Sequence, residues 1–205
     1  MPEMPSGSAA PAPGMAGERS AAAGPAVSRI YYATEFADGV STTRPLSVAM
    51  VCGDDEIYRI VNDWHAIRQA LDDPWLRENV AAYLPLSADG KPHDWAWDHE
   101  HADVTLVRTP DETAGELRDF VLTHENPQLW AWRGAYDHVV VRHLFGRITQ
   151  RPEGWPQWTG ELAALHALLG FPELPDRPVR HHALEDARWT QDAGEYLLRR
   201  WRDNE

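Results

Sequence analysis

Three short segments of this chain carry side chains that could do chemistry together. The first holds Glu35, the second holds Asp137, and the third holds His181 and Asp186, with four residues between them. Carboxylates bind divalent cations and move protons, and an imidazole accepts a proton near neutral pH. These four residues are therefore the candidate catalytic residues.

The predicted elements would bring these positions to one place. The β-rich run 29–36 predicts a first strand, on which positions 33 and 35 project from the same face. The short apolar run 128–132 predicts a fourth strand, and a parallel pairing beside the first would deliver Asp137 to the same edge. Five residues turn a helix by roughly 140°. His181 and Asp186 can therefore face one site only if His181 lies before the last helix, on a loop that folds back.

The remaining pattern predicts an α/β domain. The runs 45–52 and 56–61 predict a second and a third strand, joined by short turns as in an antiparallel meander. Thr109 is a strong helix start, because Pro110 follows it and Glu112 lies three residues on. Three antiparallel strands followed by a helix, a strand and further helices form an α/β layer pattern. We expect helices over 65–71, 74–83, from 109 onward, 134–145, 159–169 and 183–201, and a polar loop over 87–103.

Composition places these elements in one domain. Residues 1–28 are rich in Ala, Pro, Gly and Ser and predict a disordered tail, and 29–205 predict the folded domain. The apolar runs are too short for a membrane span, no export leader is evident, and a single Cys52 fits a reducing compartment, so we expect a cytoplasmic protein. The net charge of −13 argues against a large nucleic-acid footprint but permits a site that grips a few nucleotides.

The three segments resemble the signature of the DEDDh 3′-5′ exonucleases, which is Asp-x-Glu, then Tyr- or Phe-Asp, then His-x4-Asp. Tyr136 and Asp137 fit the second motif, and His181 and Asp186 fit the third. The strings IYYATEF at 30–36 and WAWRGAYDH at 130–138 are more specifically similar to the small bacterial exoribonucleases called polyadenylate-specific 3′-exoribonuclease AS. The resemblance covers the chain from about residue 29 to its end.

The resemblance implies a ribonuclease H-like α/β fold with a five-stranded mixed sheet flanked by helices. It implies metal-dependent hydrolysis of phosphodiesters from the 3′ end of RNA, single-stranded or overhanging, with release of nucleoside 5′-monophosphates. Glu35, Asp137 and Asp186 would hold Mg²⁺ or Mn²⁺ in a two-ion site, and His181 would be the general base for the attacking water. A homodimer is expected, since related enzymes commonly form one.

Two aromatic residues are candidates for substrate binding. Phe36, which follows Glu35, would stack on the terminal base. Tyr136 is a weaker candidate, for which packing against the first strand is the favoured interpretation. Trp155 and Trp158 lie in a Pro-rich loop; they are interpreted as packing anchors, with nucleic-acid contact as the alternative.

The first motif departs from the family at Ala33, where the resemblance implies an aspartate that bridges both metal ions. Ala offers no ligand atom, so we expect the chain as written to be inactive or strongly impaired, by on the order of several kcal/mol of transition-state stabilisation. Ala33 is either a deliberate substitution that traps substrate or a natural loss. The deliberate origin is favoured, because an idle site has no reason to keep the other motif residues.

Other interpretations of the same residues stay open at this point. Asp137 and Asp186 could be acids that stabilise the first turn of a helix, in which case the chain would be a protein-interaction scaffold. The same pocket could also bind a nucleic-acid end without cleaving it. His182 leaves a one-residue ambiguity about the general base. The histidines and acids of 93–103 lack the spacing of a zinc site and are interpreted as a solvated loop, and no nucleophile elbow or phosphate-binding glycine loop is present.

Overall fold

A single mixed sheet organises the chain in a computed structural model that describes residues 26–39, 43–87 and 95–204. The strand order is β4-β3-β2-β1-β5-β6. Strands β1, β2 and β3 form an antiparallel meander, whereas β5 runs parallel to β1. The strands are β1 (Arg29–Asp38), β2 (Thr43–Cys52), β3 (Asp55–Val61), β4 (Val107–Arg108), β5 (Gln128–Ala131) and β6 (Thr159–Glu161).

Within the described part of the chain the sheet has six strands, so the prediction of five was wrong in number, although the mixed α/β arrangement is confirmed. The sequence did not predict either of the two short edge strands, β4 and β6. Strand β4 has two residues and pairs in parallel with β3, and β6 has three and pairs in parallel with β5. Residues 159–161 were assigned to a helix because the leucine pattern follows at once, but that helix begins at Leu162. Such short edge segments carry too little alternation to predict a strand.

The α-helices agree with the predicted ones in order, but the predicted helix over 74–83 is a short α-helix, 74–79, followed by a 3-10 turn over 81–83. The capping box between Thr109 and Glu112 is present at the start of α3. Residues 88–94 of the predicted polar loop lie outside the described residues, and residues 95–101 contain a single bridge, between Trp97 and Leu86. The helices are α1 (Trp64–Asp72), α2 (Pro74–Asn79), α3 (Pro110–Thr123), α4 (Gly134–Leu144), α5 (Leu162–Leu168) and α6 (Ala183–Asp203), with 3-10 turns η1 (Ala81–Tyr83), η2 (Ala102–Leu106) and η3 (Ile148–Gln150).

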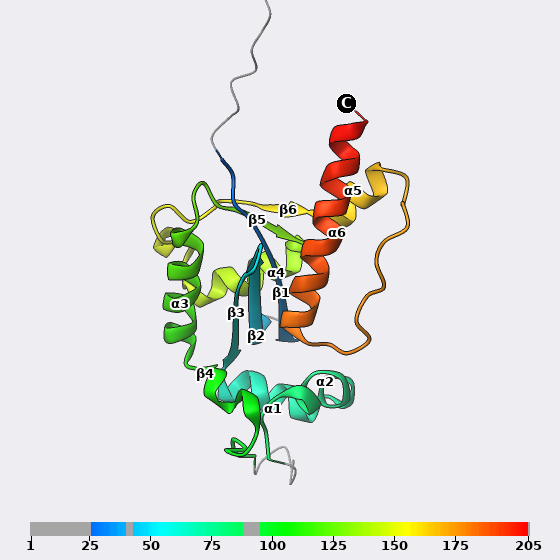
Figure 1. The fold of residues 1–205 in the computed structure, drawn as a ribbon. Helices are drawn as coiled ribbons and strands as arrows, with labels where there is room; N and C mark the ends of the chain where they lie inside the picture. Colours follow the sequence, from blue (N-terminus) through cyan, green and yellow to red (C-terminus); the bar gives the residue numbers. More distant parts are fainter. Residues whose placement is uncertain (1–25, 40–42, 88–94, 205) are drawn as a thin grey trace, which may run out of the picture.

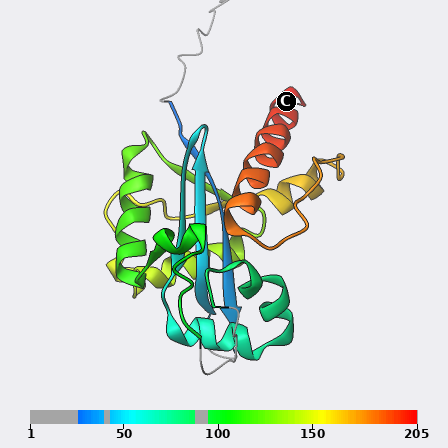
Figure 2. The ribbon, with the colours of Figure 1, turned by 60° about the horizontal axis from the view of Figure 1, so that its bottom comes forward.

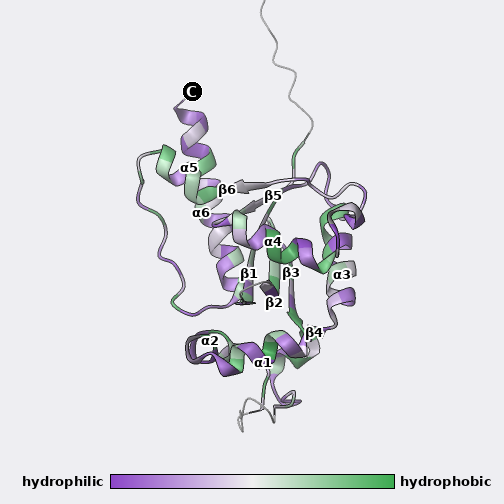
Figure 3. Cartoon of the chain, turned by 180° about the vertical axis from the view of Figure 1, so that it is seen from behind, coloured by the Kyte–Doolittle hydropathy of each residue, from purple (hydrophilic) through white to green (hydrophobic). Residues whose placement is uncertain are grey.

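Helices cover both faces of the sheet (Figures 1 and 2). Helix α6 lies along β1 on one face, with α1 and α2 beyond the end of the strands, and α3 and α4 lie on the other face. Seen from behind, α3 and α6 show hydrophilic and hydrophobic residues on different sides (Figure 3), as expected for helices that pack on a sheet by one face. Buried clusters fill both interfaces, one containing Ile67 and Ala187 and the other Leu117 and Val141.

Backbone hydrogen bonds to the sheet begin at Ser28, next to the predicted start of the folded domain. The backbone of Ser28 already bonds to that of Glu125 and Gln128, which fixes the start of β1. Residues 1–25 of the expected tail lie outside the described residues. Among the residues that are described, no helix is both long and apolar enough to cross a membrane.

A glycine sets the distance between α6 and β1. A Cβ at Gly194 would lie 2.3 Å from Cε1 of Tyr31 and 3.0 Å from Cδ1 of Leu162. Tyr31 is 1% exposed and Leu162 is fully buried, so neither can move aside cheaply. The absence of a side chain therefore lets the helix that carries Asp186 approach the strand that carries Glu35.

Replacing Gly194 with Ala should destabilise the fold by about 1–3 kcal/mol, because the added methyl overpacks a filled core. The matched control is Gly115→Ala in α3, where nothing lies within 4 Å of the added carbon. That change should stabilise the protein by up to about 1 kcal/mol through helix propensity. Urea denaturation measures both; equal effects of the two changes would contradict the close-packing account.

Candidate active site

A pocket of about 600 Å³ lies where the carboxyl end of β1 meets the starts of α2, α4 and α6. This is the edge to which parallel strands β1 and β5 deliver their following residues. Every position singled out in the three motifs lines it, namely Ala33, Glu35, Phe36, Tyr136, Asp137, His181 and Asp186.

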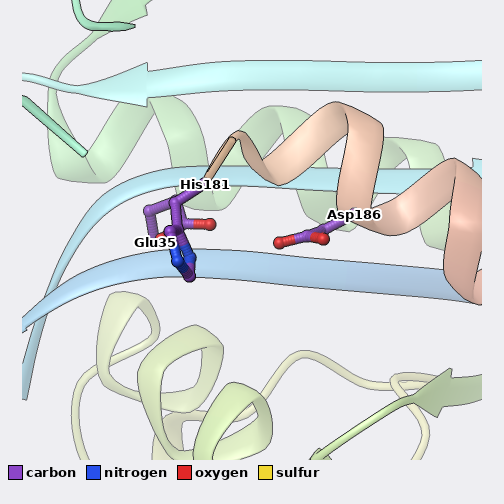
Figure 4. A group of neighbouring side chains, drawn as sticks. All are labelled: Glu35, His181 and Asp186. Carbon is purple, nitrogen blue, oxygen red and sulfur yellow. The ribbon is translucent and has the colours of Figure 1, made fainter. Parts of the chain in front are cut away.

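Glu35, His181 and Asp186 form the centre of the site. Each offers one ligand atom, and these atoms all lie within 4.8 Å of one another. Figure 4 shows Asp186 on the first turn of α6, pointing back toward Glu35 on β1, with His181 just before the helix. The predicted placement of His181 ahead of the last helix is therefore what the structure has. A register shift between Glu35 and Phe36 places an irregularity of the sheet at this point, where bulges commonly re-aim side chains.

Asp137 is held by the strand rather than by the cluster. It lies in the first turn of α4, and its Oδ1 accepts a 2.9 Å bond from the Thr34 amide and a 2.7 Å bond from the Thr34 hydroxyl. Thr34 is the middle residue of the first motif and is 7% exposed. The strand that carries Glu35 thus also fixes the orientation of Asp137.

Burial and mutual repulsion raise the pKa values of two carboxyl groups in the site, Glu35 and Asp137. Loss of water and the nearby charge of Asp186 raise the pKa of Glu35 to about 8. Loss of water also raises the pKa of Asp137, to about 6, although the two Thr34 bonds oppose the change. Raised pKa values of clustered buried acids indicate a site built for a positive charge or for proton transfer.

The structure resolves which of the two neighbouring histidines faces the pocket. His181 lines it and packs edge-on against Trp75, with ring centroids 4.9 Å apart. His182 is the N-cap of α6 and stacks on Tyr58 at 4.7 Å, and burial lowers its pKa. The assignment of His181 as the candidate base agrees with this geometry.

The aromatic candidates fall into two groups. Phe36 is half-buried and Tyr136 is 63% exposed, and both line the pocket, so Tyr136 is not packed away against β1. Trp155 is 2% exposed against Phe145, and Trp158 contacts Trp130 outside the pocket. The interpretation of Trp155 as a packing anchor is confirmed.

The pocket also contains residues that the sequence did not single out, among them an aromatic and two basic side chains that could contact a substrate. Trp75 follows Pro74 at the start of α2 and is 53% exposed. Arg133 precedes α4, and Arg177 lies in the connector before α6. An exposed Trp at a helix start is a usable signal for Trp75, but nothing in the spacing of Arg133 or Arg177 points to the pocket.

The residues present fit a divalent cation. The buried carboxylates of Glu35 and Asp186 and the imidazole of His181 lie close enough together to bind one ion. Asp137 lines the same pocket. Carboxylate-rich sets of this kind suit Mg²⁺ or Mn²⁺. Ala33 lies among them on the same face as Glu35 and contributes no donor atom.

The mixed sheet and the helices that flank it form an α/β fold of the ribonuclease H-like type. The chain is similar in structure to Escherichia coli exonuclease I, solved with a dT13 oligonucleotide, with a TM-score of 0.56 and 12% identity; the match covers 84% of this chain but only 41% of that one. The chain spans less than half of exonuclease I, and this likeness establishes the fold.

The chain belongs to the Rv2179c-like 3′-5′ exoribonuclease domain family, and residues 29–198 match the sequence pattern of that family. It is 32% identical over 164 residues to the 3′-5′ exoribonuclease Rv2179c of Mycobacterium tuberculosis H37Rv, covering 78% of this chain and 87% of that protein. The 3′-5′ exoribonuclease MT2234.1 of strain CDC 1551 matches to the same extent.

Thr34→Val should raise the pKa of Asp137 further, because the hydroxyl bond that favours its carboxylate is lost. Stability should fall by about 1 kcal/mol. Carboxyl-carbon NMR titration measures the pKa, and Thr34→Ser, which keeps the hydroxyl, is the control. An unchanged Asp137 titration in the Val variant would show that Thr34 does not orient this carboxylate.

The metal-free protein should lose stability as pH rises from about 5 to about 8. Glu35 binds its proton more tightly folded than unfolded, so its contribution is complete below the ordinary pKa and is lost on passing the folded one. Asp137 acts in the same direction at lower pH. Denaturant unfolding in a chelator measures the slope. Glu35→Gln should flatten it, whereas Glu100→Gln, at an exposed position, should not; equal slopes in all three proteins would contradict the burial account.

Proposed function

We propose that this site belongs to a metal-dependent exonuclease that removes nucleotides from the 3′ end of RNA, and that Ala33 impairs turnover in this chain. The observation that carries the proposal is the convergence of Glu35, His181 and Asp186 from separate motifs in one pocket, with Asp137 oriented beside them. Helix-capping acids of a scaffold would have no reason to meet. The family, whose relatives are named 3′-5′ exoribonucleases, supports the same chemistry and RNA as the substrate.

Different residues of the site would bind the cation and accept the proton. Glu35, Asp137 and Asp186 would hold the cation or cations. A bound divalent cation supplies positive charge beside the reacting phosphate and makes water a better nucleophile. His181 lies within reach of the same centre and takes the proton of the attacking water.

Aromatic side chains would hold the terminal nucleotide. Phe36, Trp75 and Tyr136 line the pocket, and stacking on aromatic rings suits unpaired bases of any sequence. Exonuclease I, of similar fold, has been solved with a dT13 oligonucleotide. A substrate with a single-stranded 3′ end therefore fits this pocket best. Contact with only a few nucleotides is compatible with the net charge of −13, which argues against an extensive nucleic-acid surface.

Ala33→Asp should restore or strongly raise turnover, by on the order of 10³-fold. A carboxylate at position 33 would face the same pocket as Glu35 and complete the ligand set. The measurement is release of nucleoside 5′-monophosphate from 3′-labelled RNA in Mn²⁺, with Ala33→Asn as the matched uncharged control. A second control is Ala33→Asp combined with Asp186→Asn, which should be inactive.

A second candidate, an RNA-end-binding module that does not cleave, is favoured by the missing carboxylate at position 33. The same assay separates the two. Binding of RNA without cleavage after Ala33→Asp would favour the binding module, and activity gained equally by Ala33→Asn would contradict the need for a carboxylate.

A further inference from the structure

Arg177 is a cation already in contact with the acidic centre. Its Nε lies 3.2 Å from Oδ1 of Asp186, whose side chain is only 7% exposed, while the Arg177 side chain is 43% exposed. Arg177 also lines the pocket beside Glu35. It is thus the residue that links the buried carboxylate to the open part of the pocket.

A second residue fixes where Arg177 lies. The ring of Trp189 stacks under the guanidinium of Arg177, with Cζ 5.1 Å from the ring centroid. The Trp189 indole nitrogen donates a 2.9 Å bond to the carbonyl of Pro175, which anchors the connector to α6. Because stacking holds the guanidinium plane and only Nε contacts Asp186, the rest of the planar fork can meet another anion.

We propose that Arg177 binds a phosphate of the substrate and, when no divalent cation is bound, is held by Asp186 as the internal counter-ion of the site. The inference rests on the proposed function. A cation bound at Asp186 competes for the same carboxylate and releases the guanidinium toward the pocket. A phosphate oxygen then replaces Asp186 as its partner, in the paired geometry that guanidinium and phosphate share.

This exchange couples the two ligands of the site. A cation that frees Arg177 strengthens phosphate binding, and by linkage a bound phosphate that holds Arg177 strengthens cation binding. The coupling also restrains cation binding by the empty pocket, because Arg177 must first leave Asp186. Such a role differs from that of a residue that only neutralises charge at the surface.

The test compares Arg177→Met with Arg180→Met. Arg180 lies in the same connector and pairs with Glu185, but does not line the pocket, so the control removes the same charge three residues away. Binding of Mn²⁺ alone is measured by calorimetry, and binding of fluorescein-labelled single-stranded RNA in Mn²⁺ by anisotropy. Arg177→Met should bind Mn²⁺ roughly tenfold more tightly and RNA roughly tenfold more weakly, and Arg180→Met should alter neither by more than about twofold.

Arg177→Lys keeps the positive charge but lacks the planar guanidinium. This variant replaces Arg177→Met in the test if the Met variant folds poorly. It should leave Mn²⁺ affinity near that of the parent and still weaken RNA binding. Unchanged or weaker Mn²⁺ binding by Arg177→Met would overturn the counter-ion role, and unchanged RNA binding would overturn the phosphate role, with the metal site intact in both cases. Absence of Mn²⁺ binding by both the parent and Arg177→Met would overturn the proposed function and this inference together.

Discussion

The close approach of α6 to β1 is the constraint on which the site depends. Gly194 allows the helix to press against Tyr31, and the first turn of the same helix then carries Asp186 to Glu35. The strand in turn fixes Asp137 through Thr34. One interface therefore sets the positions of three carboxylates that come from three distant segments, and stability and site geometry are coupled through it.

Bringing these carboxylates together is unfavourable without a cation. The raised pKa values of Glu35 and Asp137 express that repulsion and burial. Binding a divalent cation relieves it, and so, in part, does the contact of Arg177 with Asp186. Carboxylates that repel one another in the empty site bind positive charge strongly. A substrate phosphate needs that positive charge, because it is negative itself and must enter an acidic pocket.

Much of this arrangement could be predicted from the sequence, because it follows from strong local signals. The β-rich runs, the capping box at Thr109 and the motif spacing gave the main strands, the helices and the four candidate residues. The edge strands β4 and β6 could not be predicted, since two or three residues carry no periodicity. Arg177 and Trp75 were missed for a different reason: their roles arise from tertiary packing on Asp186 and His181, which no spacing along the chain encodes.

Anomalous scattering from crystals of this protein soaked in Mn²⁺ tests the central claim most directly, because it locates the ion without assuming any activity. A peak bounded by the carboxylates of Glu35 and Asp186, in the pocket beside Ala33, is the predicted result. Ordered crystals with both carboxylates resolved and no Mn²⁺ between them, or with Mn²⁺ bound only at acids elsewhere on the surface, would contradict the account.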